Sequence, residues 1–134
     1  MSALEPRRLA AAGALGAALS AVGNVVLFFA ASAAGTVSIP DQANPGAFTA
    51  LPIGPVIGAS IVPAVFATGF YAALITFAPA RAKAIFVGVS AVFALLSMGG
   101  PLGAPDVLSQ ATLAGMHVVS AVAIAGALAM RGQR

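Results

Sequence analysis

The only histidine of the chain, His117, is also the only ionisable residue deep inside a long apolar segment. Each of the other three apolar segments holds a polar residue at a similar place: Asn24, Thr68 and Ser97. These four residues lie 13 to 16 positions from a basic residue at the end of their segment. At 1.5 Å per helical residue, that separation is roughly 20–24 Å. The sequence therefore predicts a polar layer near mid-membrane to which each helix contributes one side chain.

The last apolar segment gives this layer a direction. Asp106, Gln110, Leu113, His117 and Ser120 recur at spacings of four and three, so they share one helical face. Ionisable groups inside a membrane usually face the bundle interior or a water-filled cavity. Three interpretations stay open: hydrogen bonds that only pack the helices, a pocket for a ligand, or a polar pathway for an ion, proton or solute. The pocket would open outward, between Gln110 and the connection 36–52.

Catalytic and metal chemistry find little support in the residue types present. No carboxylate shares the layer of His117, so neither an acid–base pair nor a Ser–His–acid triad can be assembled there. The chain has no cysteine, and a lone histidine without Cys, Asp or Glu neighbours is a poor metal site. We therefore predict no catalytic residue, no metal, no cofactor and no enzymatic activity. The net charge of +3 is too dispersed for a nucleic-acid surface.

Composition predicts the elements that position these residues. The chain is 60% hydrophobic and only 7% charged, with a mean hydropathy of +1.05. Ordinary soluble domains are about a quarter charged. Four segments, about 9–34, 53–77, 84–98 and 107–130, are apolar enough to cross a bilayer. We predict an all-α integral membrane four-helix bundle formed by residues 1–134 as a single domain, with external loops at 36–52 and 99–106.

The basic residues predict the orientation of the bundle. Arg7 and Arg8 precede the first segment, Arg81 and Lys83 separate the second from the third, and two arginines follow the fourth. Cytoplasmic loops carry the excess of Lys and Arg, so both termini are expected in the cytoplasm. We expect a multi-pass protein of a bacterial plasma (inner) membrane.

The third segment is the shortest, with only 15 residues between its limits. We expect it to extend over Arg81–Lys83 on one side and Gly99–Gly100 on the other. Gly99, Gly100 and Pro101 are expected to end the helix. Pro105 and Asp106 are expected to begin the fourth, with Asp106 as its N-cap.

Small residues are needed where membrane helices approach closely. Five glycines are candidates for such contacts: Gly13, Gly54, Gly58, Gly69 and Gly115. We favour contacts within one chain, and a homo-oligomer face stays open as the alternative. The four phenylalanines of the second and third segments are expected to pack or to face lipid: Phe66, Phe70, Phe86 and Phe93.

Four short motifs resemble a family of small four-span bacterial membrane proteins, mostly actinobacterial, whose function is unknown. The motifs are Asn24, Leu51-Pro52-Ile53-Gly54-Pro55, Ser97-x-x-Gly100-Pro101 and Leu113-x-x-Met116-His117-Val118-Val119. The resemblance covers nearly the whole chain. It implies a plasma-membrane four-helix bundle and implies no activity.

The sequence thus predicts a non-enzymatic membrane protein with membrane lipid as its surroundings and no nucleic-acid partner. Its expected function is to bind a small or lipid-like ligand in an outward-facing polar pocket. The alternative is a small homo-oligomeric transporter or channel subunit.

Overall fold

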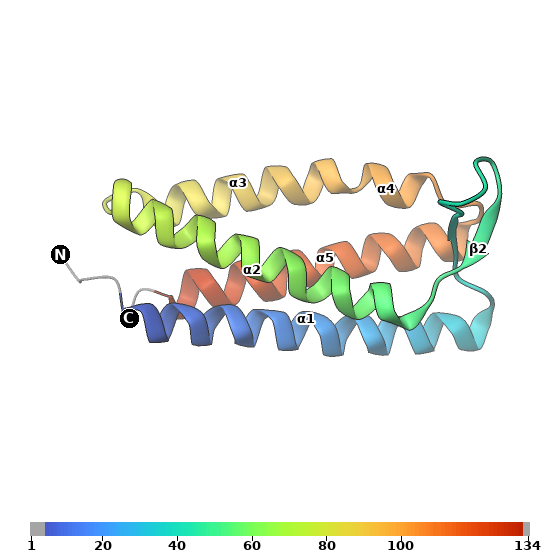
Figure 1. The fold of residues 1–134 in the computed structure, drawn as a ribbon, viewed down its shortest axis with the longest axis horizontal. Helices are drawn as coiled ribbons and strands as arrows, with labels where there is room; N and C mark the ends of the chain where they lie inside the picture. Colours follow the sequence, from blue (N-terminus) through green and yellow to red (C-terminus); the bar gives the residue numbers. More distant parts are fainter. Residues whose placement is uncertain (1–4, 133–134) are drawn as a thin grey trace.

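The computed structural model describes residues 5–132, which form four long helices, one short helix and a two-stranded hairpin (Figure 1). In chain order the elements are α1 (Pro6–Ala34), β1 (Ser38–Pro40), β2 (Phe48–Ala50), α2 (Ile53–Phe77), α3 (Ala82–Ser97), α4 (Gly99–Leu102) and α5 (Val107–Arg131). Consecutive long helices run antiparallel. This arrangement confirms the predicted all-α four-helix bundle.

The four long helical segments have the length and composition of membrane spans. At most 22% of the most apolar 18-residue window of any of them is buried inside the protein. The apolar side chains therefore mostly face outward, where only lipid can cover them without cost. A helix suits this surrounding because every interior backbone N–H finds a carbonyl in its own segment. The chain is a multi-pass membrane protein.

The third span extends over Gly99 and Gly100, as predicted, but it does not end at Pro101. Gly99, Gly100 and Pro101 do not terminate the helical segment, because they begin α4, which continues to Leu102. Proline is tolerated in the first turn of a helix, where its missing N–H would have no partner. With α4, the third span covers Ala82–Leu102, or 21 residues, which is enough to cross a bilayer.

Local chemistry sets other helix limits as well. Pro6 is the first residue of α1, a position for which its fixed φ is suited. Asp106 caps α5 as predicted, because its side chain accepts a hydrogen bond from the backbone N–H of Ser109. Pro63 lies inside α2 and leaves the carbonyl of Ala59 without its usual N–H donor.

The connection between α1 and α2 folds as an antiparallel hairpin, in which Ser38 pairs with Ala50 and Pro40 with Phe48. Its turn contains Gly46 with φ +90°, a conformation that favours glycine. The backbone N–H of Ser38 donates to the hydroxyl of Ser109 at 2.9 Å. This bond ties the hairpin to the start of α5.

Charge is segregated between the two ends of the bundle. Arg7, Arg8, Arg81, Lys83 and Arg131 all lie at the end where α1 begins, α2 turns into α3 and α5 finishes (Figure 1). We call this the basic end. Asp41 and Asp106 lie at the opposite, hairpin end. The remaining C-terminal arginine, Arg134, is outside the described residues.

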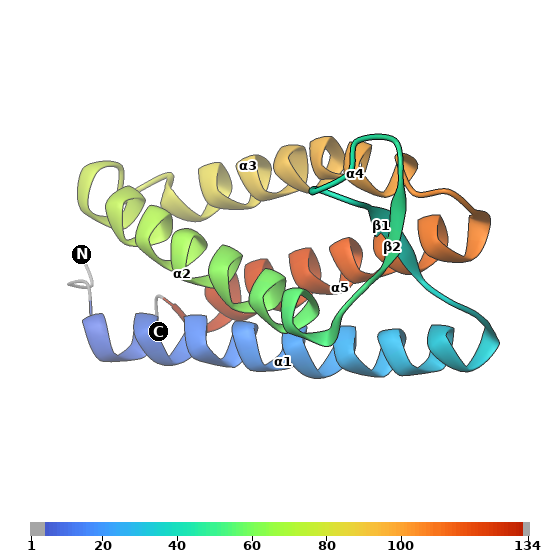
Figure 2. The ribbon, with the colours of Figure 1, turned by 45° about the vertical axis from the view of Figure 1, so that its right-hand side comes forward.

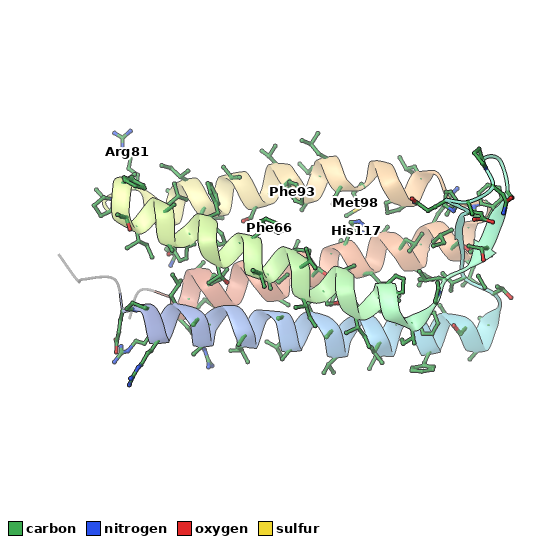
Figure 3. The ribbon with its side chains drawn as sticks, viewed as in Figure 1. Phe66, Arg81, Phe93, Met98 and His117 are labelled. Atoms are coloured by element: carbon green, nitrogen blue, oxygen red, sulfur yellow. The ribbon has the colours of Figure 1, made fainter. Side chains whose placement is uncertain are left out.

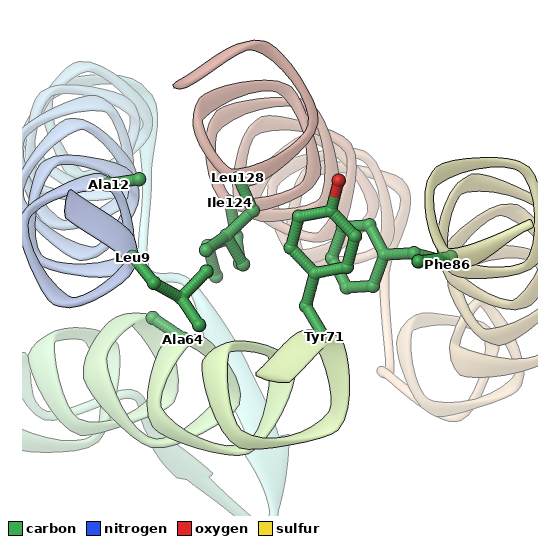
Figure 4. Close-up of a cluster of buried hydrophobic side chains, with 8 residues drawn as sticks. Leu9, Ala12, Ala64, Tyr71, Phe86, Ile124 and Leu128 are labelled. Atoms are coloured by element: carbon green, nitrogen blue, oxygen red, sulfur yellow. The ribbon is translucent and has the colours of Figure 1, made fainter. Parts of the chain in front are cut away.

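α1 packs closely against α5. A Cβ placed on Gly16 would lie 2.9 Å from the Cα of Ile124, and one on Gly23 would lie 2.6 Å from Val119. At the basic end, side chains from four helices fill the interior, among them Leu9, Tyr71, Phe86, Ile124 and Leu128 (Figure 4). A second apolar cluster under the hairpin contains Val37, Leu51, Val56 and Met116.

α2 crosses the bundle obliquely. Figures 1 and 2 both show it close to α1 at the hairpin end and close to α3 at the basic end. Two consequences follow. α1 and α2 separate toward the basic end, and α2 and α3 separate toward the hairpin end.

Candidate functional site

The structure brings Asn24 into contact with serines of two other helices. The Nδ2 of Asn24 donates to the Oγ of Ser60 on α2 and to the Oγ of Ser120 on α5, both at 2.9 Å. Ser20, one turn before Asn24, donates to the same Ser120 hydroxyl at 2.8 Å. Ser60 in turn donates to the carbonyl of Val56 at 3.0 Å. We call Ser20, Asn24, Ser60 and Ser120 the serine–asparagine cluster.

Most of this cluster is buried, and it contains no ionisable group. Asn24 is 3% exposed, and Ser20 and Ser60 are fully buried. The Oδ1 of Asn24 is also buried, and no described residue donates a hydrogen bond to it. The cluster therefore holds α1, α2 and α5 in register, and it has no group that could transfer a proton.

Thr68 does not lie at the level of Asn24. A Cβ on Gly13 would collide with the Oγ1 of Thr68, so Thr68 packs against α1 eleven residues before Asn24, which is roughly 16 Å along the helix. The counts from the basic residues assumed upright helices that start in one plane. Because α2 is oblique, Ser60 takes the place at Asn24 that was predicted for Thr68.

The other predicted polar residues bond to nearby backbone groups. Thr68 donates to the carbonyl of Ala64 at 2.7 Å, and Ser97 to that of Ala94 at 2.7 Å. The side chain of Gln110 donates to the carbonyl of Ala104 at 3.0 Å. None of them contacts the serine–asparagine cluster through a hydrogen bond. The structure therefore does not form the single layer of Asn24, Thr68, Ser97 and His117 that we predicted.

His117 is half-buried and holds one hydrogen bond within its own helix. Its Nδ1 lies 2.7 Å from the carbonyl oxygen of Leu113. A carbonyl only accepts, so Nδ1 carries the proton and, in the neutral ring, Nε2 is an acceptor. Within residues 5–132 no hydrogen bond reaches Nε2.

Nε2 belongs to a ring that lies at the space between α2 and α3. Figure 3 shows His117 at this space together with Phe66 of α2, Phe93 of α3 and Met98 beside α4. Phe66 is 74% and Phe93 69% exposed, so these rings do not close the space by packing on each other. We call this side of the bundle, where α2 and α3 diverge and where Phe66, Phe93, Met98 and His117 lie, the lateral opening.

The lateral opening is closed at the basic end by aromatic rings. Phe86 of α3 stacks on Tyr71 of α2 with ring centroids 4.5 Å apart, and Phe70 lies 6.3 Å from Phe86. Tyr71 is completely buried, and its hydroxyl has no partner among the described residues. These contacts confirm packing for Phe86, whereas Phe66 and Phe93 are exposed on the outside of the bundle.

The hairpin end does contain a hollow, but not the predicted one. A cavity of about 420 Å³ lies between the last turn of α1 and the hairpin, lined by Phe28, Gly35, Val37 and Leu51 among others. Neither Gln110 nor His117 lines it. This hollow is therefore not the outward-facing pocket that we expect between Gln110 and the connection 36–52.

The predicted packing glycines fall into two groups. Gly13 meets Thr68, and a Cβ on Gly115 would lie 3.6 Å from the Cδ1 of Leu27, which is an ordinary contact distance. No described atom outside the local backbone comes within 4 Å of a Cβ on Gly54, Gly58 or Gly69. The internal packing that we favoured for these three glycines is wrong, because α2 turns this side away from its neighbours. Gly16 and Gly23 were missed, although the spacing of positions 13, 16, 20, 23 and 24 already marks one helical face.

The described residues form no candidate metal site. No group of three His, Asp or Glu side chains lies close enough to hold an ion in residues 5–132.

The backbone N–H of Ser109, followed by its hydroxyl, holds the pKa of Asp106 below its usual value. The side chain of Asn44 and the N–H of Ala43 lower the pKa of Asp41 in the same way.

Residues 4–134 match the model of a family described as a family of unknown function, DUF6069. The chain belongs to DUF6069. Membership confirms the resemblance to small membrane proteins of unknown function. No curated protein and no solved structure was found to match this DUF6069 chain. What the DUF6069 fold can do must therefore be argued from its own residues.

Proposed function

We propose that this protein is a non-enzymatic membrane protein that binds a lipid-like ligand through the lateral opening at His117. The observation that carries the proposal is the unshared acceptor Nε2 of His117, placed where α2 and α3 stand apart. A ligand with an apolar body and one hydroxyl fits this chemistry. Its hydroxyl donates to Nε2 while its body contacts the exposed rings of Phe66 and Phe93.

The depth of His117 supports a ligand that arrives from the bilayer. His117 is ten residues from the start of α5, which is roughly 15 Å. A polar acceptor at that depth has no water to satisfy it and gains from any donor that lipid can carry. The ligand therefore enters sideways, between α2 and α3, and not from the hairpin end as we first expected.

A binding role also fits the residues around the imidazole better than catalysis does. Asp106 is eleven residues away along α5, roughly 16 Å, and is engaged with Ser109. No described carboxylate is therefore positioned to orient His117 as a general base.

The test compares an alcohol with its ether. The purified full chain in detergent is heated with farnesol or with farnesyl methyl ether, which has the same apolar body and no hydroxyl donor. One hydrogen bond contributes about 1 kcal/mol, or roughly fivefold in affinity. We expect farnesol to raise the unfolding temperature more than the ether does.

Two variants locate the effect. His117→Ala removes the acceptor, and the two probes should then act equally. Ser97→Ala is the matched control, because Ser97 bonds only to its own helix, and it should keep the preference for the alcohol. Equal stabilisation of the unsubstituted protein by both probes rules out the proposal.

A transporter or channel subunit built from several copies is the second candidate. It is favoured by Gly54 and Gly58, which present an unoccupied small-residue surface on α2 within the single chain. Close contact between copies through such glycines is common in membranes. For either function we place the protein in a bacterial plasma membrane with both termini in the cytoplasm, on the strength of the basic end.

A further inference from the structure

We propose that the groove between α1 and α2 binds an anionic phospholipid, with one acyl chain along the groove and its headgroup at Arg7. This site is separate from the lateral opening at His117. The groove has a volume of about 550 Å³, and none of the residues that line it belongs to the lateral opening. It begins at Ala10 and extends along α1 to Ala21, with Ile61, Val65 and Thr68 on the α2 side.

The groove has the length of one leaflet. Ala10 to Ala21 covers eleven residues, which is roughly 16 Å along α1. The hydrocarbon core of a bilayer is about 30 Å thick, so one leaflet contributes about 15 Å. An acyl chain that enters at the basic end therefore fills the groove before it reaches the middle of the membrane.

The groove is wide enough for one acyl chain but too narrow for a further helix. α1 and α2 already touch beneath it, where Thr68 packs against Gly13. A further helix needs about 8–10 Å between axes and would be held off by the rims of both helices. A single line of methylenes needs much less width. The alanines on α1 leave that width, and the one polar side chain of the groove, Thr68, is engaged with the carbonyl of Ala64.

Arg7 supplies the charge at the open end. It is exposed and precedes Ala10 by three residues and Ala14 by seven, so it lies on the groove face of α1. The neighbouring Arg8 forms an ion pair with Glu5. Among residues 5–132, Arg7 has no such pair, and Glu5 is the only acidic residue at this end. A phosphate or other anionic headgroup therefore meets an uncompensated guanidinium where α1 and α2 separate.

The test measures lipid retention by native mass spectrometry on the delipidated full chain. The probes are phosphatidylglycerol and phosphatidylcholine with the same acyl chains. One local arginine corresponds to about fivefold tighter binding of the anionic lipid. We expect that preference for the unsubstituted protein, and equal retention of the two lipids overturns the proposal.

Charge variants test the headgroup position. Arg7→Gln should remove the preference for phosphatidylglycerol. Arg81→Gln is the matched control, because Arg81 is basic, exposed and at the same end but sits on the turn between α2 and α3. If both variants lose the preference equally, the effect is a diffuse attraction and the proposal fails.

Size variants test the chain position. Ala14→Leu fills the groove from an exposed site and should lower retention of both lipids. Ala30→Leu, exposed on the far side of α1, should leave retention unchanged. Ala18→Leu, on the rim, repeats the test if Ala14→Leu loses helicity. Unchanged lipid retention in the groove variants overturns the proposal. So does a result in which these variants lose a cross-linked dimer but keep their bound lipid.

Discussion

Asn24 of α1 donates a hydrogen bond to Ser60 of α2 at 2.9 Å, and both side chains are shielded from the surroundings. The pair is 36 residues apart in sequence. Through Ser120 it extends to α5 and so joins three of the four spans. Interhelical hydrogen bonds in membranes average about 0.6 kcal/mol each, and their geometry fixes register as well as energy.

Asn24→Ala is expected to lower the free energy of unfolding by about 1–2 kcal/mol, because it removes two such bonds and leaves a small cavity. Ser97→Ala is the control and should change the stability by less than about 0.5 kcal/mol. Thermal or denaturant unfolding in one detergent measures both. A double-mutant cycle of Asn24→Ala with Ser60→Ala should show coupling, and strictly additive effects would contradict the contact.

The sequence could predict the spans because length and apolar composition decide them directly. Four segments without interruption by charge have few alternatives in a bilayer. The N-cap Asp106 was also predictable, since the cap is chemistry between residues three positions apart. The continuation of the third span through Pro101 could not be predicted. The sequence shows a proline there, but it does not show that the proline lies in the first turn of a new helix.

The partners of the polar residues could not be predicted, because they depend on helix tilt. Counting from basic residues placed Thr68 at the depth of Asn24, whereas the oblique course of α2 brings Ser60 to that depth. His117 was identified as exceptional from its type and depth alone. That its opening faces sideways depends on the separation of α2 from α3, which no spacing in the sequence records.

Gly16→Ala is expected to destabilise the protein by about 1–3 kcal/mol. The new Cβ would lie 2.9 Å from the Cα of Ile124, so α1 and α5 would have to move apart. Gly69→Ala is the matched control, because no described atom outside the local backbone lies within 4 Å of its Cβ position. Alanine in place of glycine inside an exposed helix should be neutral or slightly stabilising. Equal loss in both variants would show that α1 and α5 are not in this close contact.

Replacing Gly54 and Gly58 with Leu is expected to leave the unfolding temperature of the monomer unchanged. Both positions are open within the described chain, and leucine propagates a helix better than glycine. If copies associate through this side of α2, the double variant should abolish the cross-linked dimer. Cross-linking in membranes combined with thermal unfolding in detergent separates the two effects. A large loss of monomer stability would mean that Gly54 and Gly58 contact neighbouring helices, which contradicts the structure.

Reporters fused at residue 1, near Ala82 and at residue 134 are expected to lie in the cytoplasm. A reporter inserted near Gln42, in the turn of the hairpin, should lie outside. The physical reason is the retention of Lys and Arg on the cytoplasmic side, and five of these residues share the basic end. Alkaline phosphatase and fluorescent fusions distinguish the sides. An external C-terminus would contradict both the orientation and the even number of spans.

Stability should fall in acid because of Asp106. Hydrogen bonds from the backbone N–H and hydroxyl of Ser109 keep the pKa of this carboxyl below its ordinary value of 3.8. A group whose pKa is lowered by folding stabilises the protein above its unfolded pKa, and that contribution disappears as the pH falls through the folded pKa. We therefore expect the unfolding temperature to be steady near neutral pH and to drop below about pH 4.

Asp106→Ala should lower the unfolding temperature at pH 7 and weaken this acid drop. It should also loosen the hairpin, because Ser109 accepts from Ser38 while its own hydroxyl is held by Asp106. Limited proteolysis between Asp41 and Ala47 measures that release. Asp41→Asn is the control, since Asp41 also has a lowered pKa but bonds only within the hairpin turn. The Asp41→Asn variant should keep the first turn of α5 intact, and it should keep the stabilisation that Asp106 provides. If Asp41→Asn alone removes the entire acid drop, the cap of α5 does not set the pH dependence.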